Sequence, residues 1–210
     1  MNLKEENRIK KQGFKYIIGL DEAGRGALAG PVVAGAVYYT GKNAIPGVND
    51  SKKISPKKRN ELFFKLTNHP CVFWGVGAVS SFDIDKINIL EASKLAMEKA
   101  LLDLENKYKL KADYLILDGK MKLDLPINQV SIIKADEKVF SCSAASIIAK
   151  VSRDYLMCKM DSKYPNYFFP KHKGYGTKLH LEMLKKHGPC IIHRKSFRPI
   201  KKLILKRKTL

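Results

Sequence analysis

The stretch GLDEAGRGALAGP, residues 19–31, begins inside an apolar run, residues 16–20, and places two acids directly after it. This order predicts a β-strand that delivers the carboxylates of Asp21 and Glu22 to its end. Adjacent side chains on a strand point to opposite faces of the sheet, so both acids can serve one site only if the strand bends or ends there. The glycines that follow permit such a bend. Exposed acids at strand ends are common, so an ordinary polar turn is the alternative explanation for an isolated pair.

The overall charge favours a polyanionic partner. The 210 residues include 40 lysines and arginines against 20 aspartates and glutamates, a formal net charge of +20. Contacts to phosphates and the release of their counterions provide such a chain with sequence-independent affinity for nucleic acid. A surplus of lysine also keeps proteins soluble, which is the alternative explanation of the charge alone. The length and a hydrophobic fraction of 45% fit one globular domain with at most a small appendage.

Cysteine spacing and the apolar runs exclude several classes of protein. The four cysteines form no CxxC pair, which argues against a zinc site and for free thiols in a reducing compartment. Residues 1–13 are polar and charged and contain no apolar signal core. No apolar run approaches the ~20 residues of a membrane span, and no basic amphipathic helix stands out. We therefore expect a soluble, cytoplasmic protein that is monomeric and does not bind membranes.

Three strands are predicted in the first part of the chain. The run at 16–20 is followed by PVVAGAVYY, residues 31–39, and by CVFWGVGAVS, residues 71–80, both rich in β-branched and aromatic side chains. Their order predicts an antiparallel meander. A Ser-Pro pair at 55–56 marks the start of a short helix, with the serine as its cap. Residues 1–13 are expected to be frayed or to form a short basic helix.

The second half of the chain changes to a helical period. Apolar residues recur at three- and four-residue steps from 87 to 104, and Asp83 or Asp85 can cap this helix. The apolar strand at 113–117 then follows a helix, which is typical of a parallel crossover. The remaining predicted elements are a short strand at 130–133 and helices at 140–158 and 178–187. This pattern indicates an α/β fold.

Two further aspartates share the setting of Asp21. Asp118 closes an apolar strand and precedes a glycine, and Asp136 follows the fifth strand. Because sites in α/β proteins form beyond strand ends, the four carboxylates can converge. Such like charges repel unless cations neutralise them, and hard oxygen ligands favour Mg²⁺ or Mn²⁺. On a basic protein this predicts phosphodiester hydrolysis with two metal ions. Taken alone, Asp118 fits a strand-end turn and Asp136 a helix N-cap.

An ordered set of motifs resembles the type 2 ribonuclease H (ribonuclease HII) family over nearly the whole chain, from Tyr16 to Pro199. In order, the motifs are GLDEAGRGALAGPVVAGAV at 19–37, NDSKKIS at 49–55, NILEAS at 88–93, LILDG at 115–119, SAASIIAKVSRDY at 143–155, HKGYGT at 172–177 and HRKSF at 193–197. The resemblance implies a ribonuclease H-like fold, with a mixed five-stranded sheet flanked by helices and a small C-terminal helical extension. It also implies cleavage of the RNA strand of RNA–DNA hybrids, and incision at single ribonucleotides embedded in duplex DNA, leaving 3′-hydroxyl and 5′-phosphate ends.

The same resemblance assigns roles to individual residues and segments. The carboxylates that it implies as catalytic and as ligands of Mn²⁺ or Mg²⁺ are Asp21, Glu22, Asp118 and Asp136. The substrate-binding residues that it implies are Gly24, Arg25, Gly26, Lys52, Lys53 and Tyr175. Of these, the Gly-Arg-Gly turn would contact the ribose at the scissile phosphate, the lysines would contact phosphates, and the tyrosine would pack on the next deoxyribose. The segments would be a basic lead at 1–15, a catalytic domain at 16–165 and a helical substrate-binding part with a basic tail at 166–210.

The chain departs from the family pattern around Asp136. Ala135 and Glu137 flank it, where the family often has a glycine before the acid and a small residue after it. Glu137 is therefore either a spectator or a perturbation of the weaker metal position. The tail after Pro199 lies outside the resemblance. The histidines show no HExxH-like spacing and are expected to be at the surface or structural, with His172 able to touch phosphate.

Two other functions stay open on the sequence. One is a different metal-dependent nuclease of the same fold, which would also gather acids around two ions. The other is a basic RNA-binding module without catalysis, which explains the charge but not the acids at strand ends. The related type 3 enzymes are disfavoured, because no additional substrate-binding domain is expected before residue 16.

Overall fold

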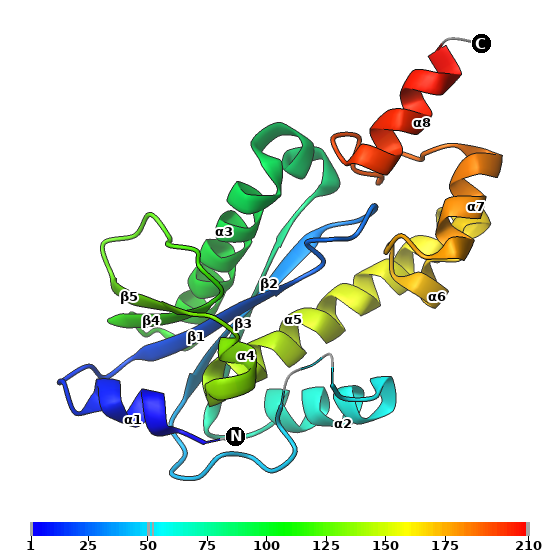
Figure 1. Cartoon of the computed structure of the whole chain (residues 1–210). Coiled ribbons are helices and arrows are strands. Elements are labelled where there is room, and N and C mark those ends of the chain that lie inside the picture. Colours follow the sequence, from blue (N-terminus) through cyan, green and yellow to red (C-terminus); the bar gives the residue numbers. More distant parts are fainter. Residues whose placement is uncertain (1, 50, 52, 209–210) are drawn as a thin grey trace.

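The computed structural model describes residues 2–49, 51 and 53–208, which fold around a mixed five-stranded sheet (Figure 1). The strand order is β3-β2-β1-β4-β5. The first three strands pair antiparallel, while β4 pairs parallel with β1 and β5 pairs parallel with β4. The strands are β1 (Ile17–Ala23), β2 (Val32–Tyr39), β3 (Val72–Val79), β4 (Tyr114–Asp118) and β5 (Asn128–Ile132). The predicted meander, the parallel crossover and the α/β class are confirmed.

Helices cover both faces of the sheet (Figure 1). The two long ones are α3 (Ser81–Tyr108) on one face and α5 (Phe140–Lys159) on the other. The shorter ones are α1 (Lys4–Lys10), α2 (Pro56–Thr67), α4 (Ala135–Lys138), α6 (Phe169–His172), α7 (Lys178–His187) and α8 (Arg198–Lys208), with 3-10 turns at Met160–Ser162 and Pro165–Tyr167. None of the helices described here is both long and apolar enough to cross a membrane.

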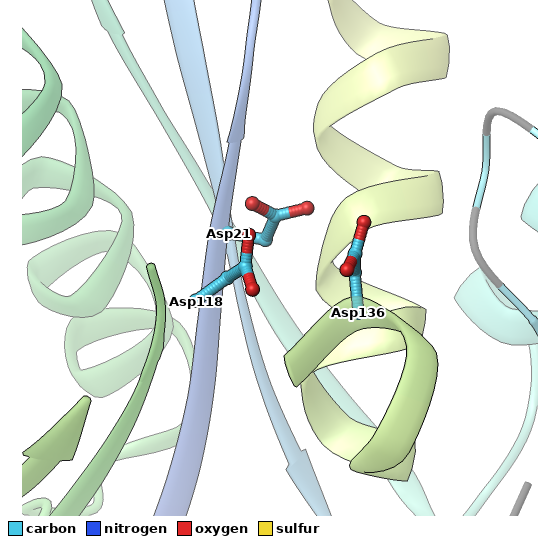
Figure 2. Close-up of side chains that lie close together, drawn as sticks. All are labelled: Asp21, Asp118 and Asp136. Carbon is cyan, nitrogen blue, oxygen red and sulfur yellow. The ribbon is translucent and has the colours of Figure 1, made fainter. Parts of the chain in front are cut away.

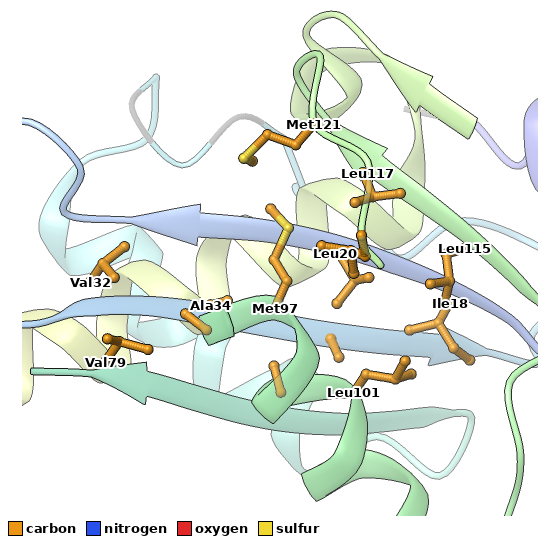
Figure 3. Packing of buried hydrophobic residues seen from close by; sticks show 14 of the residues in the cluster. Ile18, Leu20, Val32, Ala34, Val79, Met97, Leu101, Leu115, Leu117 and Met121 are labelled. Carbon is orange, nitrogen blue, oxygen red and sulfur yellow. The ribbon is translucent and has the colours of Figure 1, made fainter. Parts of the chain in front are cut away.

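Both long helices lie close against the strands because glycines face them. A Cβ atom on Gly35 would lie 2.5 Å from the Ala145 carbonyl oxygen of α5, and one on Gly75 would lie 2.3 Å from the Ala100 carbonyl oxygen of α3. Larger apolar side chains fill the remaining space between α3 and the sheet, among them the fully buried Met97 (Figure 3). The central strand β1 is therefore held rigidly between two layers of helix, which favours precise placement of the acids that it carries.

The predicted end of β1 at Leu20 is wrong. The strand continues through Ala23 and keeps its register with β2, so that Asp21 lies opposite Gly35 and Glu22 opposite Ala34. The reason is that β2 offers backbone partners beyond the point where the apolar run stops. The two acids consequently follow the strand alternation and occupy opposite faces of the sheet.

The predicted cap of α3 is also wrong. Ser80 caps this helix, because its hydroxyl accepts a hydrogen bond from the Asp83 amide at 3.1 Å. Asp85 instead accepts the amides of Lys195 and Ser196 at 2.8 and 2.9 Å. This carboxylate therefore ties the C-terminal part of the chain to the start of α3.

The N-terminal part packs onto the sheet and α5. The predicted short basic helix is α1, whose Ile9 is fully buried. The Glu6 carboxylate accepts the Ser141 amide at 2.9 Å and so caps the first turn of α5. Farther along, Ser55 caps α2 as predicted, accepting the Lys58 amide at 3.3 Å.

The C-terminal part has an apolar cluster of its own. Its members include the fully buried Phe169, Leu184 and Ile200, which pack against Leu28 and Ala29 from the segment that follows β1. The start of the basic tail thus belongs to the packed structure. The segment after β1 is held between the sheet and these C-terminal helices.

Candidate active site

Asp21 and Asp118 lie next to each other at the centre of the sheet (Figure 2). The parallel register of β1 and β4 sets Leu20 opposite Leu117, and the following residues of both strands therefore share the face covered by α5. Oxygens of these two carboxylates and of Asp136 all lie within 4.8 Å of one another. Asp21 is 4% exposed and Asp136 is 3% exposed. Three separate elements thus build one group of acids, in which Asp21 and Asp136 are buried and Asp118 is partly exposed.

Asp136 enters this group on the short helix α4. Lys134, with a left-handed backbone (φ 59°), starts that helix. The Ala135 amide then donates to Asp118 Oδ1 at 2.6 Å, and the Ser143 hydroxyl donates to the Asp136 carbonyl. The alternative of a simple helix N-cap is wrong for Asp136, because it lies inside α4 and its side chain points to the other two aspartates (Figure 2).

Burial and crowding make Asp21 and Glu22 hard to ionise. Desolvation, followed by the charges of Glu22 and Asp118, raises the pKa of Asp21 well above its ordinary value. Burial also raises the pKa of Glu22, and the nearby charge of Arg25 opposes that rise. A bound cation relieves such a conflict by stabilising the ionised forms. The all-oxygen donor set fits a hard divalent ion such as Mg²⁺ or Mn²⁺.

Glu22 lies apart from the three aspartates, on the opposite face of β1. Its Oε1 accepts a hydrogen bond from the Arg25 guanidinium at 3.1 Å. Its Oε2 is buried and finds no hydrogen-bond partner among the described residues. A buried carboxylate oxygen of this kind is costly unless a ligand meets it. The group of possible metal ligands among the described residues does not include Glu22, although the charge of Asp118 contributes to raising its pKa.

The Gly-Arg-Gly turn at 24–26 directly follows β1 and lies beside the loop that carries Tyr175. The Leu28 amide donates to the Gly174 carbonyl at 2.8 Å and joins the two segments. A Cβ atom on Gly26 would meet no atom within 4 Å, so that side of the turn is open. The structure therefore brings together two motifs that are far apart in the sequence and that are both predicted to bind substrate.

Two buried arginines hold this region, and the sequence reasoning did not single out either of them. Arg153 and Arg194 are both 0% exposed. Their acceptors are backbone carbonyls of Ala29, Pro31 and Lys173 for the first, and of Arg25 and Gly30 for the second. Burial, and then the charge of Arg153, lowers the pKa of Arg194 to about 9. The available signal was an arginine that follows the run of small and apolar residues in the helix motif SAASIIAKVSRDY.

Tyr175 is half-buried and flanked by cations. The Arg153 guanidinium carbon lies 5.2 Å from the centre of its ring, and Lys150 Nζ lies 5.3 Å from it. These contacts fall within the range of cation–π attraction. They hold the ring next to the turn at 24–26.

The lysine block is only partly described. Lys52 lies outside the described residues. Lys53 Nζ pairs with the Glu137 carboxylate at 2.9 Å, and Lys134 Nζ lies 3.7 Å from the same carboxylate. The cluster of possible metal ligands among the described residues does not include Glu137. This acid contacts lysines beside the site.

Three of the histidines, His172, His180 and His193, form a buried group. Of the two expected positions, at the surface or structural, the structural one is therefore correct for them. His180 Nδ1 bonds the Tyr175 carbonyl at 2.9 Å, and its Nε2 faces His193 Nε2 at 3.0 Å. His193 Nδ1 accepts the Cys190 amide at 2.9 Å. These contacts are satisfied together only when both rings are neutral. His172 bonds the protein through both ring nitrogens, which leaves neither for a phosphate.

Comparison with known proteins gives a consistent result. The family model of ribonuclease HII matches residues 18–200. A ribonuclease HII of Chlamydia muridarum is 52% identical over 199 residues, which is 95% of this chain and 89% of that protein. One of Caldicellulosiruptor bescii is 49% identical over 192 residues, 91% of each chain. The crystal structure of ribonuclease H2 from Pyrococcus horikoshii superposes with a TM-score of 0.72 at 26% identity, covering 93% of this chain and 100% of that one. The chain therefore belongs to the ribonuclease HII family.

Proposed function

We propose that the protein hydrolyses the RNA strand of RNA–DNA hybrids and incises at single ribonucleotides embedded in duplex DNA, leaving 3′-hydroxyl and 5′-phosphate ends. Its family makes it a type 2 ribonuclease H, an endonuclease. The observation that carries the finer activity is the position of the aspartate cluster beside the turn at 24–26 and the Tyr175 loop. The carboxylates that would act on the phosphate thus lie next to the turn and the tyrosine that would recognise the sugars.

The carboxylates would hold two divalent ions, Mg²⁺ or Mn²⁺. Asp21, Asp118 and Asp136 offer oxygens within 4.8 Å of one another, and the neighbouring Glu22 has a buried carboxylate oxygen with no partner among the described residues. When bound, such ions supply an activated water and stabilise the leaving oxygen of an in-line displacement. The protein residues hold these oxygens in place: the Ala135 amide orients Asp118 at 2.6 Å, and the paired strands orient Asp21.

The turn at 24–26 would recognise the ribonucleotide. The 2′-hydroxyl distinguishes RNA from DNA at one position, and it both donates and accepts hydrogen bonds. The open side of Gly26 lets backbone groups approach it closely. Tyr175 would pack on the sugar that follows.

The wider surface would bind the duplex. The net charge of +20 supports phosphate contacts, and Lys53 lies near the site through its pair with Glu137. We assign substrate binding to the helical part at 166–210, because it packs directly on the segment that follows β1. A monomeric state and a cytoplasmic location stay predictions.

Cleavage assays on three duplexes test this proposal. The substrates are a continuous RNA–DNA hybrid, a DNA duplex with one ribonucleotide, and an all-DNA duplex, each with Mg²⁺, with Mn²⁺ or with EDTA. We expect metal-dependent cuts in the first two and none in the third. Cutting of all-DNA duplex would indicate a different nuclease of this fold. Binding without any cut would indicate a nucleic-acid-binding module.

A further inference from the structure

We propose that Arg153 is a positioning residue for substrate choice: it sets the turn at 24–26 and Tyr175 at a fixed separation, so that recognition of a ribose is coupled to recognition of the next sugar. The inference rests on the proposed incision at single ribonucleotides and extends it. A junction between RNA and DNA is defined by two neighbouring sugars. An enzyme that recognises both sugars must hold the groups that contact them, here the turn at 24–26 and the Tyr175 ring, one nucleotide apart.

The hydrogen bonds of Arg153 join the two loops. Its Nε donates to the Pro31 carbonyl at 2.9 Å and its Nη2 to the Ala29 carbonyl at 3.1 Å, both in the segment that follows the turn. Its Nη1 donates to the Lys173 carbonyl at 2.9 Å, in the loop of Tyr175. A guanidinium offers these donors in one rigid plane, so the three acceptors are held in a fixed arrangement.

The same guanidinium also contacts the turn at 24–26 and the Tyr175 ring directly. A Cβ atom on Gly24 would lie 2.0 Å from Arg153 Nε, so the arginine packs directly against the turn backbone where only a glycine fits. Its central carbon lies 5.2 Å from the centre of the Tyr175 ring. One side chain therefore contacts the turn and the ring at once.

The complete burial of Arg153 indicates that its contacts with the two loops require an arginine at this position. Arg153 is fully buried, and it donates hydrogen bonds to three neutral carbonyls. Burying a cation costs solvation free energy, and an apolar side chain would fill the same space without that cost. A lysine would keep the charge but would lose the planar fork and most of the contact with the ring.

Arg194 offers a matched control within the same region. It donates to the Arg25 carbonyl at 2.8 Å and to the Gly30 carbonyl at 3.0 Å, so it supports the same turn. Its guanidinium lies 5.0 Å from the Phe197 ring, however, and not over Tyr175. A change at Arg194 should disturb the turn while leaving the contact between Arg153 and the Tyr175 ring in place.

The test compares kcat and KM of Arg153→Lys, Arg153→Met and Arg194→Lys on a duplex with one ribonucleotide and on a continuous hybrid. For the Arg153 variants we expect the ratio of kcat/KM values, single ribonucleotide over hybrid, to fall about tenfold, the size of a lost cation–π contact in a buried site. Arg194→Lys should lower both values together and leave their ratio near that of the wild type. The loss of ratio should not add to that of Tyr175→Ala in the double variant, because both changes break one coupling.

Melting temperatures establish which variants are folded, and one folded Arg153 variant suffices. Equal losses on both substrates, or fully additive losses with Tyr175→Ala, would overturn the inference while the proposed function stands. If every Arg153 variant is unfolded, Arg153 serves the fold and the inference is also overturned. A wild-type protein that cuts hybrids but ignores single ribonucleotides would refute the proposed incision activity itself.

Discussion

At the residue scale, we expect the chemistry to depend most on Asp21. We expect Asp21→Asn to abolish cleavage while affinity for hybrid stays close to wild type, because basic groups supply the affinity. The raised pKa of Asp21 means that its ionised form opposes folding, and this cost grows as the pH rises above its usual pKa. In metal-free buffer the variant should therefore melt higher than the wild type at neutral pH, and the advantage should vanish near pH ~4.

Cleavage, binding and melting assays with EDTA check these outcomes. Asp113→Asn is a suitable control, since Asp113 accepts the amides of Lys15 and Tyr16 at 2.8 Å, outside the acid cluster. It should lower the melting temperature and leave cleavage intact. Near-normal turnover of Asp21→Asn would contradict the assignment of the metal site.

We expect Tyr175 to act on the substrate through its ring rather than its hydroxyl. Tyr175→Phe should keep much of the activity at a single ribonucleotide, while Tyr175→Ala should lose about 1–3 kcal/mol, roughly ten- to a hundredfold. The loss should be larger there than on a continuous hybrid, where the next sugar is a ribose. Kinetics on both substrates measure this. Tyr155→Ala, which removes a 59% exposed tyrosine of α5, should change neither. Equal losses on both substrates for Tyr175→Ala would reduce its role to that of a loop anchor.

At the scale of elements, the buried histidines join α7 to the loops around Tyr175. Burial is the largest cause that lowers the pKa values of His180 and His193 to about 4. Unfolded histidines take up protons near pH ~6.5, so the unfolded state binds more protons below that pH and stability falls. The contribution is present above about pH 6.5 and is lost progressively as the pH falls toward about 4.

Melting temperatures measured from neutral to acid pH test this link. His193→Gln should melt lower than the wild type at neutral pH but should show a shallower loss on acidification. His187→Gln, at an exposed position of the same helix region, should keep the wild-type slope. An unchanged slope in His193→Gln would show that acid stability is determined elsewhere.

At the scale of the whole molecule, the charge of +20 predicts strong dependence of binding on salt. Each phosphate that the protein neutralises should contribute a log–log slope of about −0.7 to −0.9. Lys201 and Lys202 of α8 are exposed, whereas the adjacent Ile200 is fully buried. Replacing both lysines by glutamine therefore probes the tail without removing its core contact.

We expect this double variant to bind hybrid and plain DNA more weakly by a similar factor, with a less steep salt dependence. The position of the cut should stay the same. Titrations at several salt concentrations, with mapping of the cut by gel, check both points. A shifted cut would show that the tail takes part in substrate choice.

Local features and the family of this protein could be predicted from the amino-acid sequence. The β-branched runs, the Ser55 cap and the helix at 178–187 depend on neighbours along the chain, and they agree with the structure. The order of the motifs was enough to name the family, which the comparisons confirm. Strand-end acids on a basic chain were enough to suggest a metal-dependent nuclease.

The contacts between side chains from distant parts of the chain could be seen only in the folded protein. The parallel register of β1 and β4 brings Asp21 and Asp118 onto one face, and the unexpected length of β1 sends Glu22 to the other. Arg153 can be buried because two loops, distant in the sequence, supply backbone carbonyls that accept its hydrogen bonds. The physical reason is the same in each case. The spacing of apolar residues along a segment predicts whether that segment forms a helix or a strand. The burial and the partners of a side chain depend instead on backbone pairing between elements far apart in the chain.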